Sequence, residues 1–430
     1  MIKEYLQKIN SNRMARDYLW VFGGQTFASL LHLVSMAIII FVIGHEGNGV
    51  LLVVQAFSYL CGDIVNPQSF KAVVKFITEA KNKVERQNII TQGMWLDIFS
   101  GILGVAIAVL IMKPIAAWMK FDATLNVLLY LYLPCVFFRH TNSGSAIGVL
   151  RYLGKFNFTI IAYDVVSVVR ILAYLILMSI NCSTKEFIIV ECTMEVLYAI
   201  LLIVFAQIYS IKEGYHFLNF TKPKFNKTFI SFNLYNMAAS TADMSLGNLS
   251  SLIVSRYLGA SLLSVFNTLG KISSIFSRFT TPLTQVVYPS FCKYVNELDF
   301  KRVKRFIVVY TVGIGFATVL MTIIGYTTFD LWRGIFGIGE EYLPETIIYI
   351  VFTMATCIGI PYHSAHTAFG LMKLNLINVC VIDVIYCLAL IPIIKQFGLI
   401  GLITLLLIQS IVMIIVKWMQ ELKYMKAYSR

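Results

Sequence analysis

Polar side chains recur at helical spacing within two long apolar stretches of the chain. In residues 261–290 they are spaced alternately three and four apart, at Ser264, Asn267, Lys271, Ser274, Arg278, Thr281 and Gln285. Residues 231–255 repeat the pattern, at Asn233, Asn236, Ser240, Asp243, Gly247 and Ser250. This spacing places each set on one face of a helix. Because a polar face is unfavourable against hydrocarbon, both faces must meet protein or water.

Two stretches near the N-terminus carry thinner polar stripes. The first contains Gln25, Ser29, His32 and Ser35, and the second contains Gln55, Tyr59, Gly62, Asn66 and Ser69, with Asp63 beside them. One interpretation is a dry interface in which the striped helices hydrogen-bond to one another. The two cations Lys271 and Arg278 on one stripe, with Asp243 on its neighbour, favour a hydrated lumen instead.

Ionisable residues inside the apolar stretches are a second signal. The acids are Asp63, Asp97, Asp164, Glu191, Glu195, Asp243 and Asp383, and the bases are Arg139, Arg170, Lys271 and Arg278. Each needs a partner, a cavity or a task, because a charge in the bilayer centre costs about 2.5–3.5 kcal/mol even on lenient scales. We expect Asp97 to reach the cytoplasmic interface and Asp63 to pair with Arg278. For each charge, a structural ion pair and a substrate contact are both open.

The elements that must position these residues are transmembrane helices. Hydrophobic residues make up 58% of the 430 residues and charged ones only 13%, which excludes a soluble body. A bilayer core needs about 20 apolar residues per helix. By that length the sequence predicts an all-α polytopic protein with twelve spans, near 18–43, 47–70, 91–113, 125–149, 158–180, 187–209, 231–255, 261–290, 306–329, 345–370, 374–394 and 398–420.

Loop charge predicts the orientation of these spans. Of the 35 Lys and Arg residues, 25 lie in the two terminal segments and alternate loops, and six lie in the other loops. The excess marks the cytoplasmic side, so residues 1–17 and the tail 421–430 are both expected there. The net charge of +13 is then a topology signal facing anionic lipid, and it implies no nucleic-acid partner.

Short motifs recur in the same order in the two halves of the chain. Ser145–Arg151 (SAIGVLR) returns as Thr367–Lys373 (TAFGLMK), Asp164-Val-Val returns as Asp383-Val-Ile, and Pro67 is matched by Pro282. We interpret the chain as a duplication, with an N-terminal lobe at 18–209, a cytoplasmic loop at 210–230 and a C-terminal lobe at 231–420. Six spans per lobe make this a parallel repeat.

Prolines fall within the fourth span of each half, at Pro134 and Pro361. Broken helices at matching places are candidates for hinges and binding sites. His363 and His366 follow the second proline at i, i+3, but no third ligand is evident, so the sequence predicts no metal site.

Further motifs cover both halves. They are Val54-Gln55-Ala56-Phe57, Gln68-Ser69-Phe70-Lys71-Ala72-Val73-Val74-Lys75, Gly148-Val149-Leu150-Arg151 with Lys155-Phe156, and Leu258-Gly259 leading through Phe266-Asn267 to Pro282-Leu283-x-Gln285-x-x-Tyr288-Pro289. They resemble the polysaccharide flippases of the multidrug/oligosaccharidyl-lipid/polysaccharide (MOP) superfamily, in particular the O-antigen (Wzx-type) branch. Phe70 departs from the tryptophan that relatives often have. With the twelve-span layout, the resemblance covers essentially the whole chain.

The resemblance implies two pseudo-symmetric six-helix lobes around a central cavity, lined by the first, second, seventh and eighth helices. It also implies a substrate: an undecaprenyl-pyrophosphate-linked oligosaccharide repeat unit, moved from the cytoplasmic to the periplasmic leaflet of the bacterial inner membrane. The protein would be a transporter rather than an enzyme, without a cofactor. It would be surrounded by membrane lipids and have polysaccharide polymerase machinery as a further partner.

Within this interpretation the polar residues receive three roles. Lys271 and Arg278 bind the pyrophosphate, with Arg139 and Arg170 as further candidates, because cations suit phosphate oxygens. The candidates for lining the cavity and contacting the glycan are Gln25, His32, Gln55, Asn66, Asn233, Tyr235, Asn236, Ser240 and Asn267. Coupling to H⁺ or Na⁺, or gating, is assigned to Asp63, Asp164, Asp243 and Asp383.

Two alternatives belong to other functional classes. A multidrug-type (MATE-like) cation-coupled antiporter would not be expected to carry lumenal cations. A membrane-embedded polysaccharide polymerase or acyltransferase would need a substantial outer loop, and the longest one, about 330–344, offers only Asp330, Arg333, Glu340 and Glu341 as charged residues.

Overall fold

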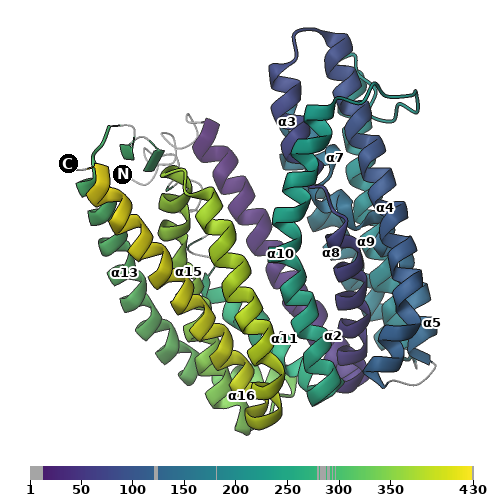
Figure 1. Ribbon diagram of the computed structural model, residues 1–430. Coiled ribbons are helices and arrows are strands. Elements are labelled where there is room, and N and C mark those ends of the chain that lie inside the picture. The colour runs from purple at the N-terminus through teal and green to yellow at the C-terminus, as the bar shows by residue number, and fades with distance from the viewer. Residues whose placement is uncertain are drawn as a thin grey trace, which may run out of the picture. The chain divides into compact units, whose positions relative to one another are not determined.

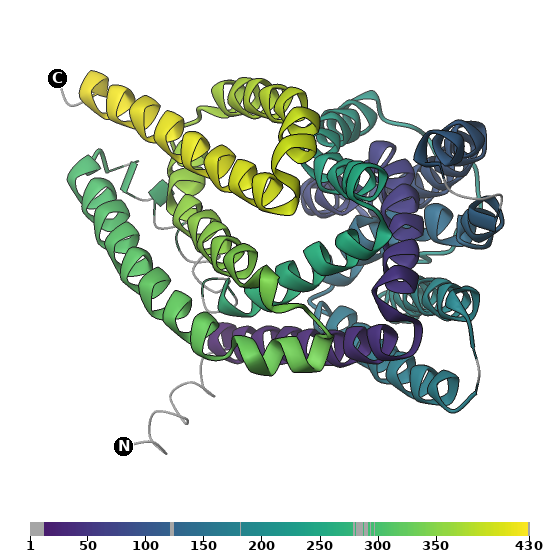
Figure 2. The same ribbon diagram turned by 90° about the horizontal axis from the view of Figure 1, so that it is seen from below.

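The computed structural model describes residues 13–120, 124–180, 182–277 and 297–428, together with 280, 287, 291, 292, 294 and 295. All regular secondary structure in these residues is helical (Figures 1 and 2). The first part contains α2 (Arg13–Ile64), α3 (Ser69–Glu79), α4 (Lys83–Met119), α5 (Thr124–Leu131), α6 (Leu133–Phe138), η1 (Arg139–Ser143), α7 (Ser145–Tyr152), α8 (Asn157–Met178) and α9 (Thr184–Lys212). The second contains α10 (Lys227–Leu258), α11 (Ala260–Ser277), α13 (Phe300–Thr327), α14 (Phe329–Phe336), η3 (Glu340–Tyr342), α15 (Leu343–Ala368) and α16 (Met372–Tyr428).

Seven helices in the described part of the chain are long and apolar enough to cross a membrane. Two of them, Thr26–Glu79 and Lys373–Ala427, contain 54 and 55 residues, more than twice the length that one crossing needs. The backbone leaves helical geometry inside each, at Gly44 in α2 and at Gly398 in α16. Each therefore accounts for two predicted spans, and the expected all-α membrane fold is confirmed.

The fourth predicted span is broken in the way that its proline suggests. Pro134 cannot donate a backbone hydrogen bond, and the helix stops and restarts around it as α5, α6, η1 and α7. The matching proline behaves differently, because α15 continues through Pro361 without interruption. The predicted helix break at Pro361 is therefore wrong.

The chain forms two compact units, Met1–Arg256 (unit 1) and Tyr257–Arg430 (unit 2). In unit 1, α2 packs on α8, α8 on α9, and α4 on α3 and α6 (Figure 1). In unit 2, α15 packs on both α13 and α16 (Figure 2). Only 6% of the most apolar stretch of α13 is buried among the described residues.

The loop between α9 and α10 is fastened to α4 by reciprocal hydrogen bonds. The Gln87 side chain donates to the His216 carbonyl (2.7 Å) and accepts from the His216 amide (2.8 Å). Asn88 does the same with Lys224, at 3.0 and 2.9 Å. These hydrogen bonds hold the start of α10 against unit 1, and α10 belongs to that unit. The boundary between the two sequence repeats, predicted at residues 210–230, stays a prediction.

The backbone turns of the two halves recur at a nearly constant offset. Gly44, inside α2, and Gly259, between α10 and α11, both have positive φ (68° and 95°). The number of residues between them equals the number between Pro67 and Pro282. Gly154 and Gly370 (φ 68° and 74°) are separated by almost the same distance along the chain. Gly154 and Gly370 also end their helices in the same way. The glycine amide bonds to the carbonyl three residues back, and the next amide bonds to the carbonyl five residues back.

This equivalence corrects one sequence match. SAIGVLR and TAFGLMK align Gly148 with Gly370. Gly148 lies inside α7, whereas Gly370 forms the turn between α15 and α16. The true counterpart of Gly370 is Gly154, so the two motifs are similar in letters but out of register.

Candidate functional site

A buried ion pair links the second half of α2 to the turn that follows α6. Arg139 Nε donates to Asp63 Oδ1 at 2.9 Å, and its Nη2 donates to Oδ2 at 3.3 Å. Asn248 Nδ2 donates to the same Oδ2 at 3.1 Å. The Asp63 side chain is only 1% exposed, and the guanidinium also lies 3.9 Å from the centre of the Tyr59 ring. This two-pronged geometry is the strong form of an arginine–carboxylate contact.

The local sequence explains how Arg139 reaches Asp63. Pro134 starts a short helix, which passes into the 3₁₀ turn at Arg139. Gly62 leaves room for the arginine stem, because a Cβ at this position would lie 2.6 Å from Arg139 Cβ and Cγ. A helix break and a glycine on the facing helix together place the pair.

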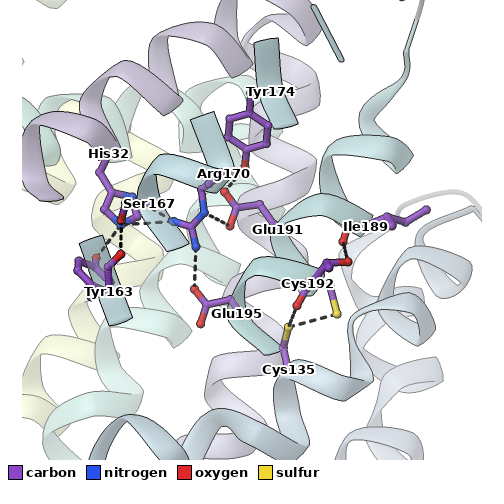
Figure 3. A network of polar contacts seen from close by, with 11 residues as sticks. His32, Cys135, Tyr163, Ser167, Arg170, Tyr174, Ile189, Glu191, Cys192 and Glu195 are labelled. Atoms are coloured by element: carbon purple, nitrogen blue, oxygen red, sulfur yellow. Dashed lines mark hydrogen bonds and ion pairs between the residues drawn. The ribbon is translucent and has the colours of Figure 1, made fainter. Parts of the chain in front are cut away.

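A second cluster surrounds Arg170 on α8 (Figure 3). Its Nε lies 3.6 Å from Glu191 Oε2, and its Nη2 lies 3.6 Å from Glu195 Oε1. The two glutamates are one turn apart on α9, so both face α8. Arg170 is 4% exposed, and Tyr174 donates a hydrogen bond to Glu191.

The Arg170 cluster extends to the first half of α2 through His32. His32 Nε2 lies 2.6 Å from the Tyr163 hydroxyl and 3.4 Å from Arg170 Nη1. Figure 3 shows His32, Arg170 and the two glutamates converging from α2, α8 and α9. Three predicted spans therefore meet at one guanidinium.

The charges of the two clusters do not balance. Asp63, Glu191 and Glu195 supply three carboxylates against the two guanidinium groups of Arg139 and Arg170. The Tyr59 ring packs on the Arg139 guanidinium group, so Tyr59 belongs to the first cluster. With all three carboxyl groups ionised and His32 neutral, these side chains would carry one excess negative charge, which would suit a cation more than an anion.

Asp97 is buried among protein side chains, and its expected position at the cytoplasmic interface stays a prediction. Its Oδ1 accepts from the Ser69 hydroxyl at 2.6 Å, and its Oδ2 accepts from both the amide and the hydroxyl of Ser145 at 2.7 and 2.5 Å. Close approach is required here, because a Cβ at Gly144 would lie 2.8 Å from Oδ2. Asp97 therefore joins α3, α4 and α7.

The other predicted residues of unit 1 fall into three groups. Asn66 is buried and bonds to Ser143, and Gln55 is half-buried on α2. On α10, Asn233 is buried and bonds back to Phe229, Asn236 is half-buried, and Tyr235 is 78% exposed. Asp164 is half-buried on α8, with no hydrogen-bond partner at Oδ1 among the described residues.

The remaining predicted residues lie on or near the helices of unit 2 or on positions without a described side chain. Lys271 is exposed on α11, one turn beyond the half-buried Asn267. Asp383 on α16 accepts a hydrogen bond from Gln409 at 2.7 Å. Gln25, Ser240 and Asp243 lie on helices whose side chains at those positions are not described, and Arg278 lies outside the described residues. The predicted Asp63–Arg278 pair is untested, and the partner of Asp63 that the structure gives is Arg139.

Glu191 and Glu195 are among the acids that the sequence places inside apolar stretches, but the predicted site does not include them. Their i, i+4 spacing on an apolar helix was the available signal, because it puts both on one face. Tyr163 and Asn248 carried no comparable signal. In the described ranges, no three histidine, cysteine or acidic side chains are grouped as metal ligands.

Comparison with solved structures shows a shared architecture at low identity. An inward-facing MATE family multidrug resistance transporter of the MOP superfamily has a TM-score of 0.74 and 12% identity, with 93% of this chain and 95% of that chain covered. The lipid II flippase MurJ, in an inward closed conformation, has 0.68 and 15%, with 93% and 87% covered. A mutant of the Vibrio cholerae MATE transporter VcmN has 0.61 and 13%, with 95% of both chains covered.

Sequence comparison gives the family. No curated protein sequence matches the chain. The model of the family described as polysaccharide biosynthesis protein matches residues 14–295, which is more than half of the chain and includes the buried charges of both clusters in unit 1. The chain is thus a multi-pass membrane protein with the fold of the transporters compared above, and it belongs to the polysaccharide biosynthesis protein family.

Proposed function

We propose that the protein is a flippase that moves an undecaprenyl-pyrophosphate-linked oligosaccharide repeat unit, of an O-antigen or a related surface polysaccharide, across the bacterial inner membrane. The observation that carries this proposal is the family match over residues 14–295. The likeness to MurJ supports it, because that protein is a flippase of another lipid-linked molecule, lipid II. Both termini are placed in the cytoplasm on the basis of loop charge, and the polymerase machinery is a proposed partner.

Alternating access is the proposed mechanism. Relatives with this fold have been captured in inward-facing and outward-facing conformations. A membrane potential that is negative inside would assist the outward movement of an anionic headgroup, by about 2.3 kcal/mol per charge per 100 mV. H⁺ or Na⁺ would be the exchanged ion, and the excess negative charge of the Asp63–Glu191–Glu195 group supports cation binding in unit 1.

The pyrophosphate is assigned first to Lys271, with Arg278 beside it on the same predicted face. Lys271 is exposed, whereas Arg139 is half-buried and Arg170 is buried. The more exposed side chain is easier for a phosphate group to reach, so the two arginines rank behind Lys271. The amides Asn267 and Asn236 would contact the glycan.

Charge reversal at Lys271 tests this assignment. We expect Lys271→Glu to abolish surface polysaccharide while membrane insertion is unchanged, and Lys271→Arg to retain most of it, since the charge is kept. Lys113→Glu, at an exposed position of α4, is the matched control and should behave as wild type. Normal polysaccharide in the Lys271→Glu and Arg278→Glu strains would exclude this phosphate site.

Lipid analysis of a deletion strain tests the function itself. We expect single repeat units to accumulate on their carrier in the cytoplasmic leaflet, where an added periplasmic enzyme cannot reach them. Normal surface polysaccharide in that strain would contradict the proposal.

A cation-coupled small-molecule antiporter is a second candidate. The observation that favours it is the acidic excess in unit 1, which would suit a cationic substrate. Binding of a fluorescent organic cation to the purified protein, with no binding of an anionic glycolipid, would favour the antiporter over the flippase.

A further inference from the structure

Four titratable side chains face one another in unit 2, outside every site described above. His363 and His366 lie near the end of α15, at i, i+3. Lys417 and Glu421 lie on the last part of α16, at i, i+4, and the two helices pack together. Both spacings bring the members of a pair onto one helix face.

The four side chains form two contacts. Lys417 Nζ lies 3.2 Å from His363 Nδ1, and His366 Nδ1 lies 3.7 Å from Glu421 Oε1. His366 and Glu421 are both 0% exposed. In the described part of the protein, neither ring nitrogen of His366 and neither carboxylate oxygen of Glu421 has a hydrogen-bond partner.

Burial of an ionised carboxylate without a hydrogen-bond donor is strongly unfavourable. A proton on the Glu421 carboxyl group relieves this cost, because it leaves a neutral acid beside His366. The other elements packed here contribute apolar side chains to the adjoining core. The 280–295 segment and α13 contribute Val287, Phe291, Val303 and Ile307 to the same core, while the basic residues of α13, Lys301, Arg302, Lys304 and Arg305, lie outside that core. The first half of α16 contributes Asn378, which is bonded to Gln420.

A route to solvent lies one helix turn away. A surface pocket of about 520 Å³ is lined by Phe300, Lys301, Lys304, Leu422, Met425 and Lys426. Met425 is four residues beyond Glu421 and is itself buried, so it separates the carboxyl group from the pocket. Three lysines around the opening repel metal cations, and imidazole and ammonium groups are poor ligands for Na⁺, which prefers oxygen. A proton can pass by exchange through water.

We propose that His366 and Glu421 form a proton-binding site, tuned by Lys417 and reached through the pocket beside Met425. Resting on the proposed function, we further assign this proton to transport, with its uptake and release linked to movement between α15 and the last part of α16. The site contains none of the four aspartates first considered for coupling.

Infrared titration of the full-length protein in lipid nanodiscs tests proton binding without any substrate. We expect a carbonyl band of a protonated carboxylic acid that persists to higher pH than the bands of surface acids and that disappears in Glu421→Gln. Glu341→Gln, at an exposed position, is the control and should keep this band. Lys417→Gln should raise the midpoint of the titration by about 1 pH unit, because a neighbouring cation that stabilises the carboxylate is removed.

Two results would overturn the proton site. One is a wild-type spectrum without any component that Glu421→Gln removes. The other is an unchanged midpoint in Lys417→Gln, which also decides the matter if Glu421→Gln fails to fold.

The transport role has a separate readout. We expect Glu421→Gln cells to lose surface polysaccharide, whereas normal polysaccharide would remove the link to transport. If the spectra are as expected but a deletion strain makes normal polysaccharide, the flippase proposal fails and the proton site stands.

Discussion

At the scale of single residues, the energetics of unit 1 depend on how Arg170 is compensated. Its guanidinium group is buried between Glu191 and Glu195, so removing it leaves two acids without their cation. Removal of one partner from a buried pair typically costs about 3–5 kcal/mol, whereas an exposed pair contributes about 0–1 kcal/mol. Burial, rather than distance, decides which ion pair matters.

We therefore expect Arg170→Met to lower the thermal stability of the purified protein strongly, and Arg302→Met to leave it nearly unchanged. The control pair Arg302–Asp299 is closer, at 2.9 Å against 3.6 Å, but Arg302 is 65% exposed. Unfolding followed by tryptophan fluorescence measures both variants, and equal shifts in melting temperature would refute this account.

The sequence indicated which charges are buried, but it could not indicate their partners. Asp63 pairs with Arg139, far away along the chain, because the break at Pro134 turns the chain and Gly62 admits the arginine stem. A contact between residues so far apart along the chain produces no periodic pattern in the sequence. Asp97 shows the same limit, since its two serine partners come from α3 and α7 and nothing in its own span distinguishes a buried position from an interfacial one.

At the scale of elements, the turns between helices depend on glycines with positive φ. At such positions a side chain brings Cβ against the neighbouring carbonyl, at a cost of about 1–2 kcal/mol. Gly44 and Gly259 occupy equivalent turns, between the first two predicted spans of each half. Inside an ordinary helix the effect is reversed, because alanine is favoured over glycine by about 1 kcal/mol.

We expect Gly44→Ala and Gly259→Ala each to lower the stability or the folded yield of the protein in detergent. Gly313→Ala on α13 should be neutral or stabilising, since an added Cβ there meets no atom within 4 Å. Size-exclusion profiles after graded heating compare the three. Equal loss in all of them would show that the turns do not require glycine.

The positions of the long helices were predictable because they coincide with the most hydrophobic stretches, whereas helix continuity through proline was not predictable. Pro134 lies at the start of a new short helix, whereas α15 continues through Pro361, although both prolines lie in the fourth span of their half. The sequence match between Gly148 and Gly370 also paired positions with different structures, since one lies inside a helix and the other forms a turn. Short runs of small and apolar residues look alike in both settings.

At the scale of the whole molecule, the distribution of Lys and Arg sets the expected orientation of the protein. The 25 residues in one set of loops against six in the other set are a large bias for a chain of 35 such residues. The hydrogen bonds that join α4 to the loop between α9 and α10 lie on the proposed cytoplasmic side. The proposed proton site near the C-terminus lies on the same side.

Reporter fusions test this orientation. Fusions after residue 430 and within residues 217–223 should give fluorescent green fluorescent protein and inactive alkaline phosphatase, because these positions lie in the proposed cytoplasmic segments. A fusion within residues 333–344 should give the opposite result. An active phosphatase at the C-terminus would invert the topology and with it the direction of transport.

The recurrence of glycine turns at matching places in the two halves has an evolutionary consequence. A half-length ancestor would already have possessed these bends, and since six crossings return to the starting leaflet, fusing two gene copies required only a short connector. After fusion, each half could mutate independently. The present chemical asymmetry, with arginine–carboxylate clusters in the first copy and a histidine–glutamate pair in the second, is the kind of specialisation that identical copies under one gene could not acquire.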